Sequence, residues 1–277
     1  MLLMMATNLI FLAIDIYLAH HISGTIVSNE WIPIVFGAVG GVLLLLAGLM
    51  AIRFRPVASV IATLTFIVSI GVGLLGAYFH VMRGILPTAP PGERVSVALL
   101  VWAPPVLGPL MFAMVGVLGI SAVWREDPPD SGRLVLWGNT HLQLPYPKTQ
   151  AYFYIVGMAA LATIISSVLD HARAGFANPW LWIPNVIGIF GTAVAVTLGA
   201  ISKPTHADLI TYFVAMLLLI ITGITGFLLH VSTNLLADGT FVLERFIRGA
   251  PFMAPLLFAN VGTIGLIALL DPTEAQP

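Results

Sequence analysis

The feature that most restricts the fold is a series of apolar stretches, each about 20 residues long and almost free of charge. A helix needs about 20 apolar residues to cross the hydrocarbon core of a bilayer, which is about 30 Å thick. Lipid permits only helices and closed barrels, and barrel strands would alternate apolar with polar residues. We therefore predict an all-α integral membrane protein with eight transmembrane helices. The predicted spans are residues 3–22, 31–53, 57–82, 98–123, 149–172, 180–201, 207–234 and 250–270.

The composition agrees with a membrane location and excludes several other classes of protein. Apolar residues make up 59% of the 277-residue chain and charged residues 8%, whereas a soluble domain has about 25% charged residues. So few charges could not cover a soluble enzyme, and so apolar a chain is not disordered. The formal charge of −1 argues against nucleic acid as a partner. The absence of cysteine excludes disulfides and thiolate-bound metals, so the expected partner is the lipid bilayer.

Lysine and arginine are shared almost evenly between the two sides of the membrane. We define side X as the side that holds the N-terminus and side Y as the opposite side. The predicted spans then assign six basic residues to side X and five to side Y. Because basic residues favour the cytoplasmic side, this small excess places the N-terminus in the cytoplasm. We expect the membrane to be a plasma (inner) membrane.

The sequence contains an internal duplication. Residues 18–40 align without gaps on residues 169–191, with nine identities in 23 positions that include a tryptophan, a proline and a histidine. Residues 109–119 share seven of eleven positions with residues 255–265. Each repeat contains four predicted helices, an even number, so both should run through the membrane in the same direction. The duplication therefore predicts two parallel four-helix repeats about a pseudo-twofold axis along the membrane normal.

The duplication divides the chain into three predicted segments. Residues 1–124 form the first four-helix transmembrane repeat, and residues 149–277 form the second. Residues 125–148 form a polar linker between them. Two short alternating runs in this linker flank Gly138 and Asn139, which predicts a small hairpin on side X.

Four of the seven histidines belong to the repeated pattern and lie near the Y ends of predicted spans. An ionisable residue inside a span is costly and is therefore a candidate for function. Two of these histidines are preceded by glycines four and seven residues earlier, which lie on the same helix face as the imidazole. The repeated residues are His20, His80, His171 and His230, with Gly73, Gly76, Gly223 and Gly226.

The bare helix surface beside each imidazole suits a flat ligand such as a porphyrin. Neutral imidazole is a common axial ligand of haem. We therefore expect haem b as the cofactor, with the four repeated histidines as metal ligands and the four glycines as cofactor contacts. The function that follows is a membrane electron-transfer subunit, which exchanges electrons with a quinol or with other redox subunits.

Three other interpretations remain open. The same imidazoles could bind copper or zinc, although the sequence has no His-x-His or Met-x-Met clusters. A transporter or channel with parallel repeats could use the histidines, together with Asp15 and Asp170, for proton coupling. Spaced glycines in membrane helices most often mean close helix packing, which suits a structural subunit of a membrane complex that has no cofactor.

Overall fold

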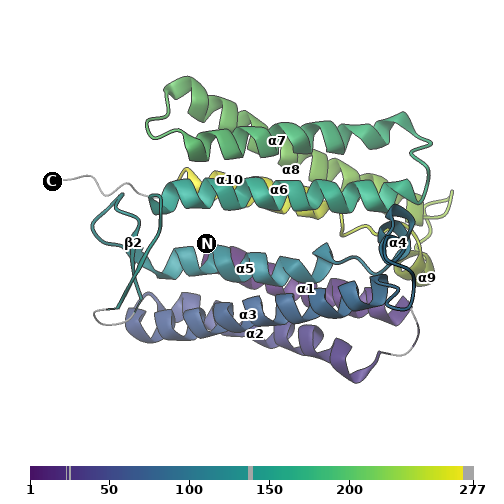
Figure 1. The fold of residues 1–277 in the computed structure, drawn as a ribbon, viewed down its shortest axis with the longest axis horizontal. Coiled ribbons are helices and arrows are strands. Elements are labelled where there is room, and N and C mark those ends of the chain that lie inside the picture. The colour runs from purple at the N-terminus through teal and green to yellow at the C-terminus, as the bar shows by residue number, and fades with distance from the viewer. Residues whose placement is uncertain (23, 25, 137–139, 271–277) are drawn as a thin grey trace. The chain divides into compact units, whose positions relative to one another are not determined.

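The computed structural model describes residues 1–22, 24, 26–136 and 140–270, and the chain is mostly helical (Figure 1), with 72% of its residues in helices. Within these ranges, six helices are long and apolar enough to cross a membrane. They lie at six of the predicted spans. This helical content is consistent with the predicted all-α membrane protein. These helices are α1 (Leu2–Ile22), α2 (Trp31–Met50), α3 (Arg55–Gly84), α6 (Lys148–Ala172), α7 (Ile183–Ala200) and α8 (His206–Asn234).

The fourth predicted span, residues 98–123, is interrupted. It consists of the six-residue helix α4 (Val97–Trp102) and the 17-residue helix α5 (Leu107–Val123). Pro104 and Pro105 lie in the break between them. Proline has no N–H to donate and disfavours helical geometry at the residue before it, so two prolines in succession end a helix.

The eighth predicted span, residues 250–270, is shorter than expected. The short helix α9 (Leu243–Arg248) precedes it, and helix α10 (Leu256–Ala268) has only 13 residues. At 1.5 Å per residue, such a helix rises about 20 Å, which is less than the thickness of the hydrocarbon core. Pro251 and Pro255 lie in the segment between α9 and α10, so proline again delays the start of the helix.

A small antiparallel sheet follows α5. Its strands, in spatial order, are β1 (Arg125–Glu126), β2 (Arg133–Val135) and β3 (His141–Gln143). Strands β2 and β3 pair at the place where the sequence predicts a hairpin. The predicted turn at Gly138 and Asn139 lies outside the described residues. Strand β1, which the sequence analysis did not predict, pairs with the other edge of β2.

The chain divides into two compact units. The N-terminal unit comprises Leu2–Ile120 and Ile165–Trp182, and the C-terminal unit comprises Met1, Ser121–Ile164 and Ile183–Pro277. The division cuts across α6, between Ile164 and Ile165. The predicted segments 1–124, 125–148 and 149–277 follow the order of the chain, whereas the compact units follow contacts in space.

Small residues let the helices of the N-terminal unit approach closely. A Cβ atom added to Gly37 of α2 would lie 2.7 Å from the carbonyl oxygen of Leu9 in α1. The hydroxyl of Ser69 in α3 donates a 2.7 Å hydrogen bond to the carbonyl of Phe112 in α5. Large apolar side chains such as Val39 on α2 are exposed instead. This distribution is typical of helices that pack through small residues and present apolar side chains to lipid.

Buried tyrosines connect the helices of the C-terminal unit by hydrogen bonds. Tyr212 of α8 is fully buried, and its hydroxyl donates a 3.0 Å hydrogen bond to the carbonyl of Gly265 in α10. The hydroxyl of Tyr152 in α6 donates a 3.3 Å hydrogen bond to the carbonyl of Ile264, the residue before Gly265. Because a buried hydroxyl needs a partner, these two bonds fix α10 against α6 and α8.

Candidate functional site

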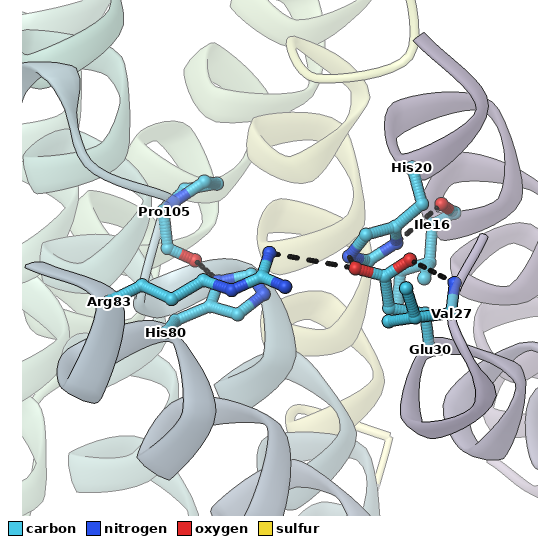
Figure 2. Close-up of polar contacts among 7 residues, drawn as sticks. All are labelled: Ile16, His20, Val27, Glu30, His80, Arg83 and Pro105. Carbon is cyan, nitrogen blue, oxygen red and sulfur yellow. Dashed lines mark hydrogen bonds and ion pairs between the residues drawn. The ribbon is translucent and has the colours of Figure 1, made fainter. Parts of the chain in front are cut away.

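His20 and His80 lie beside each other in the N-terminal unit (Figure 2). His20 lies near the end of α1, and His80 lies about one turn before the end of α3. Their ring centroids are 6.1 Å apart, and their ring planes are inclined at 71°. Both side chains are partly buried. Of the four predicted ligands, this is the pair that the structure brings together within one unit.

A backbone carbonyl holds each of these two rings. The Nδ1 atom of His80 lies 2.9 Å from the carbonyl oxygen of Pro105, and Nδ1 of His20 lies 2.9 Å from that of Ile16. Because a carbonyl oxygen only accepts hydrogen bonds, Nδ1 must be the donor in both contacts. The other ring nitrogen, Nε2, is then the atom that can bind a metal or a proton, and metal-binding histidines are usually held in this way.

The contact between His80 and Pro105 follows from the break between α4 and α5. A complete helix would enclose this carbonyl in its own hydrogen-bond pattern, but here the helix restarts after it. The carbonyl of Pro105 accepts one bond from the N–H of Gly108 at 3.3 Å and the shorter one from His80. Polar backbone groups need such partners in lipid, so the imidazole stabilises the break.

His230 has the same arrangement in the C-terminal unit. Its Nδ1 atom lies 3.0 Å from the carbonyl oxygen of Pro251, in the break before α10. His171, the remaining repeated histidine, lies near the end of α6 and belongs to the N-terminal unit. Its Nδ1 atom lies 3.3 Å from Oγ of Ser167, and its ring meets that of Phe176 edge-on. His171 and His230 therefore belong to different units.

The glycines that precede His80 face the short helix α5. A Cβ atom added to Gly73 would lie 2.5 Å from the backbone nitrogen of Ala113, and one added to Gly76 would lie 2.7 Å from Cβ of Pro109. Both distances are shorter than van der Waals contact. The surface that the sequence predicts beside a flat cofactor is therefore covered by a helix.

The glycines that precede His230 have matching contacts with α10. A Cβ atom added to Gly223 would lie 2.4 Å from the backbone nitrogen of Ala259, and one added to Gly226 would lie 2.7 Å from Cβ of Pro255. Spaced glycines commonly allow two membrane helices to approach closely. The four glycines thus allow α5 and α10 to pack closely against α3 and α8. Protein atoms therefore fill the space that the sequence pattern predicts for a flat ligand.

Sequence reasoning missed one charged residue at this site, Glu30, which pairs with Arg83. Oε1 of Glu30 lies 3.6 Å from Nη1 of Arg83 and 3.9 Å from Nε2 of His20. The other carboxylate oxygen of Glu30 accepts a 3.0 Å hydrogen bond from the N–H of Val27. Glu30 lies outside the predicted spans and aligns with Leu181 in the second repeat, so neither span prediction nor the duplication singled it out.

The donor set limits which metal centres fit. Among the residues that the structure describes, no group of three or more His, Asp or Glu side chains is arranged to hold a metal ion. Zinc sites almost always use three or four protein ligands. Two opposed imidazoles suffice for haem, because the macrocycle supplies the other ligands. The pair of His20 and His80 therefore supplies fewer protein ligands than a zinc site needs.

Asp15 and Asp170, the acidic residues considered for proton coupling, also lie in the N-terminal unit. Asp170 is close enough to Asp15 to act on it electrostatically. Asp170 also pairs with Arg173, at 3.9 Å. Arg173 in turn donates a 2.9 Å hydrogen bond from Nε to the carbonyl of Val101. The ion pair and the hydrogen bond of Arg173 connect the end of α6 with the end of α4.

We predict that Gly73→Ala destabilises the protein, because the new methyl group meets backbone atoms of α5. Overpacking of this kind costs about 1–3 kcal/mol, so the thermal midpoint in detergent should fall. Gly71, two residues earlier on α3, has no atom within 4 Å of an added Cβ. Gly71→Ala is therefore the matched control and should leave the midpoint unchanged or slightly higher. Equal midpoints for the two variants would contradict the packing role.

Comparison with known proteins gives no family for this chain. No family model matches it, and neither does any curated protein or any solved structure. Its function must therefore be inferred from contacts among its own residues. The strongest of these is the pair of His20 and His80, with Glu30 and Arg83 beside it.

Proposed function

We propose that this chain is a membrane haem-b-binding electron-transfer subunit, with His20 and His80 as the axial ligands. The observation that carries the proposal is the separation of 6.1 Å between the two ring centroids. Imidazoles that bind one metal ion from opposite sides, with metal–nitrogen bonds of about 2 Å, have ring centroids roughly 6 Å apart. The spacing of the pair therefore suits one metal ion between the rings.

The hydrogen bonds of the two rings support the same proposal. Each ring donates from Nδ1 to a backbone carbonyl, which favours the tautomer whose Nε2 carries a lone pair. Such a contact also restricts rotation of the ring and raises the basicity of the ligand. Both rings can therefore serve as neutral nitrogen ligands without rearrangement of the backbone.

Haem would supply one-electron storage at this position, and the residues around it suggest how it is approached. Arg83 lies beside the His80 ring (Figure 2) and is a cation that a propionate could meet. Trp31, the first residue of α2, is 45% exposed, and tryptophan favours the headgroup layer of a membrane. A centre near this layer could exchange electrons with a quinol from the bilayer or with another redox subunit on side Y.

We also propose that the architecture is two parallel four-helix repeats, with α5 and α10 as their short fourth members. Matching contacts support this proposal: His80 bonds Pro105 as His230 bonds Pro251. The glycine contacts of α3 with α5 likewise resemble those of α8 with α10. The location in a plasma (inner) membrane, with a cytoplasmic N-terminus, remains a prediction from the basic residues.

The first test of the proposed function is an absorbance spectrum of the protein purified in detergent after expression with added haem. We expect a Soret band in the wild type and its loss, or a marked decrease, in His20→Ala and His80→Ala. His21 is the matched control, because it is exposed, adjoins His20 on α1 and stacks on Tyr17. His21→Ala should keep the full haem content.

Two results would contradict the haem proposal. One is a wild-type protein without a Soret band under these conditions. The other is equal haem content in the His20, His80 and His21 variants. Measurement of the thermal midpoint in parallel separates loss of a ligand from loss of the fold, because His80→Ala also removes the bond to Pro105.

A second function, transport of a proton or small solute, is favoured by a different observation. Short, proline-interrupted helices at corresponding positions of two repeats are typical of transporter binding sites. Helices α5 and α10 are short, and each follows a proline break beside a histidine. Asp15 and Asp170 would be the groups able to pass a proton onward.

The transport interpretation predicts proton flux in proteoliposomes that enclose a pH-sensitive dye. After a pH step, wild-type vesicles should equilibrate faster than empty vesicles. Vesicles with the double variant Pro104→Ala, Pro105→Ala should be slower than the wild type, because these substitutions favour a continuous helix. Equal rates in all three preparations would exclude a proton pathway through this break.

A further inference from the structure

We propose that a cavity where α5 and α10 end and α6 begins binds the headgroup of an anionic phospholipid. The cavity has a volume of about 250 Å³, and residues from the ends of these three helices line it. All of its lining residues belong to the C-terminal unit, whereas His20 and His80 belong to the N-terminal unit. The cavity is therefore a second candidate site, independent of the proposed haem.

One part of the cavity wall carries a cation and two hydroxyl groups. Lys148, the first residue of α6, and its neighbour Thr149 line this part together with Ser121 of α5. Ammonium and hydroxyl groups donate hydrogen bonds, and lysine is a common partner of phosphate. Basic pockets between transmembrane helices at a membrane surface are typical binding sites for anionic lipid headgroups. The polar wall therefore suits a lipid phosphate.

The rest of the wall is apolar, which a free phosphate ion would not require. Ala122 of α5 and Ile267 of α10 line this part, and so does Leu270, just after the end of α10. Leu270 is 76% exposed, so the cavity opens beside it. Pockets for drug-sized ligands have volumes of about 300–1,000 Å³. This smaller cavity suits a headgroup and the first carbons of its chains.

Hydrogen bonds to neighbouring elements hold the wall in place. Tyr152 also lines the cavity, one turn after Lys148 on α6, and its hydroxyl donates a 3.3 Å hydrogen bond to the carbonyl of Ile264 in α10. Oε1 of Glu126 in β1 accepts a 3.1 Å hydrogen bond from the backbone N–H of Lys148. Because this carboxylate already caps the start of α6, recognition of the phosphate falls to the side chains of the wall.

The charge of the wall indicates which headgroup matches it. Among the lining residues that the structure describes, Lys148 is the only basic side chain. A single cation matches a headgroup with a single net negative charge, as in phosphatidylglycerol. Phosphatidylcholine carries the same phosphate but has no net charge, so it is the natural comparison.

The experiment measures lipid binding to the full chain in detergent, by native mass spectrometry and by the thermal midpoint. Added phosphatidylglycerol should bind and raise the midpoint, because a ligand that binds the folded state stabilises it. Phosphatidylcholine should raise the midpoint less, because it lacks net charge. Inorganic phosphate should also raise it less, because it makes no contact with the apolar wall.

Three variants locate the effect. Lys148→Gln should weaken phosphatidylglycerol binding about tenfold, because a charge-assisted hydrogen bond is lost. Lys203→Gln is the matched control, because Lys203 is an exposed lysine of the same unit that lies between α7 and α8. It should bind phosphatidylglycerol as the wild type does. Ala122→Leu keeps every charge and narrows the cavity, so it should also weaken binding.

Each opposite result has a definite meaning. Equal midpoint shifts with phosphatidylglycerol and phosphatidylcholine overturn recognition of the charge, and an equal shift with inorganic phosphate overturns the lipid as its source. Wild-type affinity in Lys148→Gln, or an equal loss in Lys203→Gln, overturns the assignment to this cavity. If Lys148→Gln does not fold, Ala122→Leu carries the test, and wild-type affinity in that variant overturns the inference.

Discussion

In both units, the hydrogen bond from a histidine Nδ1 to a proline carbonyl connects a long helix to the break before a short one. The break leaves backbone carbonyls outside the regular hydrogen-bond pattern of a helix, and the imidazole supplies the second donor to Pro105 and the corresponding one to Pro251. The same bond fixes the ring, and the fixed ring determines where Nε2 points. In the N-terminal unit, it points into the pair formed with His20.

The six long helices could be predicted from the sequence because an apolar stretch of sufficient length has one stable form in lipid. The lengths of α5 and α10 could not be predicted from apolar length alone. Pro104 and Pro105 are apolar residues and extend an apolar run, although their backbone ends a helix. Hydropathy does not register the N–H groups that are missing at Pro104 and Pro105 and at Pro255, before α10.

The site was only partly visible in the sequence. The repeated pattern identified His20 and His80, and the spacing of Gly73 and Gly76 placed them on the same helix face as His80. Spacing does not distinguish a helix from a flat ligand as the group that covers this face. The structure covers it with α5. Glu30 was missed because its contacts with His20 and Arg83 depend on the path of a loop between two helices, and no residue pattern encodes that path.

The anchoring of His80 has a consequence for proton movement. An imidazole passes protons along a chain of groups by accepting one at one nitrogen and releasing another from the opposite nitrogen. In His80, Nδ1 donates a hydrogen bond to a carbonyl oxygen, which has no proton to donate and cannot pass a proton on. Any proton that reaches this ring must leave by the edge through which it came, so His80 can end a proton wire but cannot form a link within one.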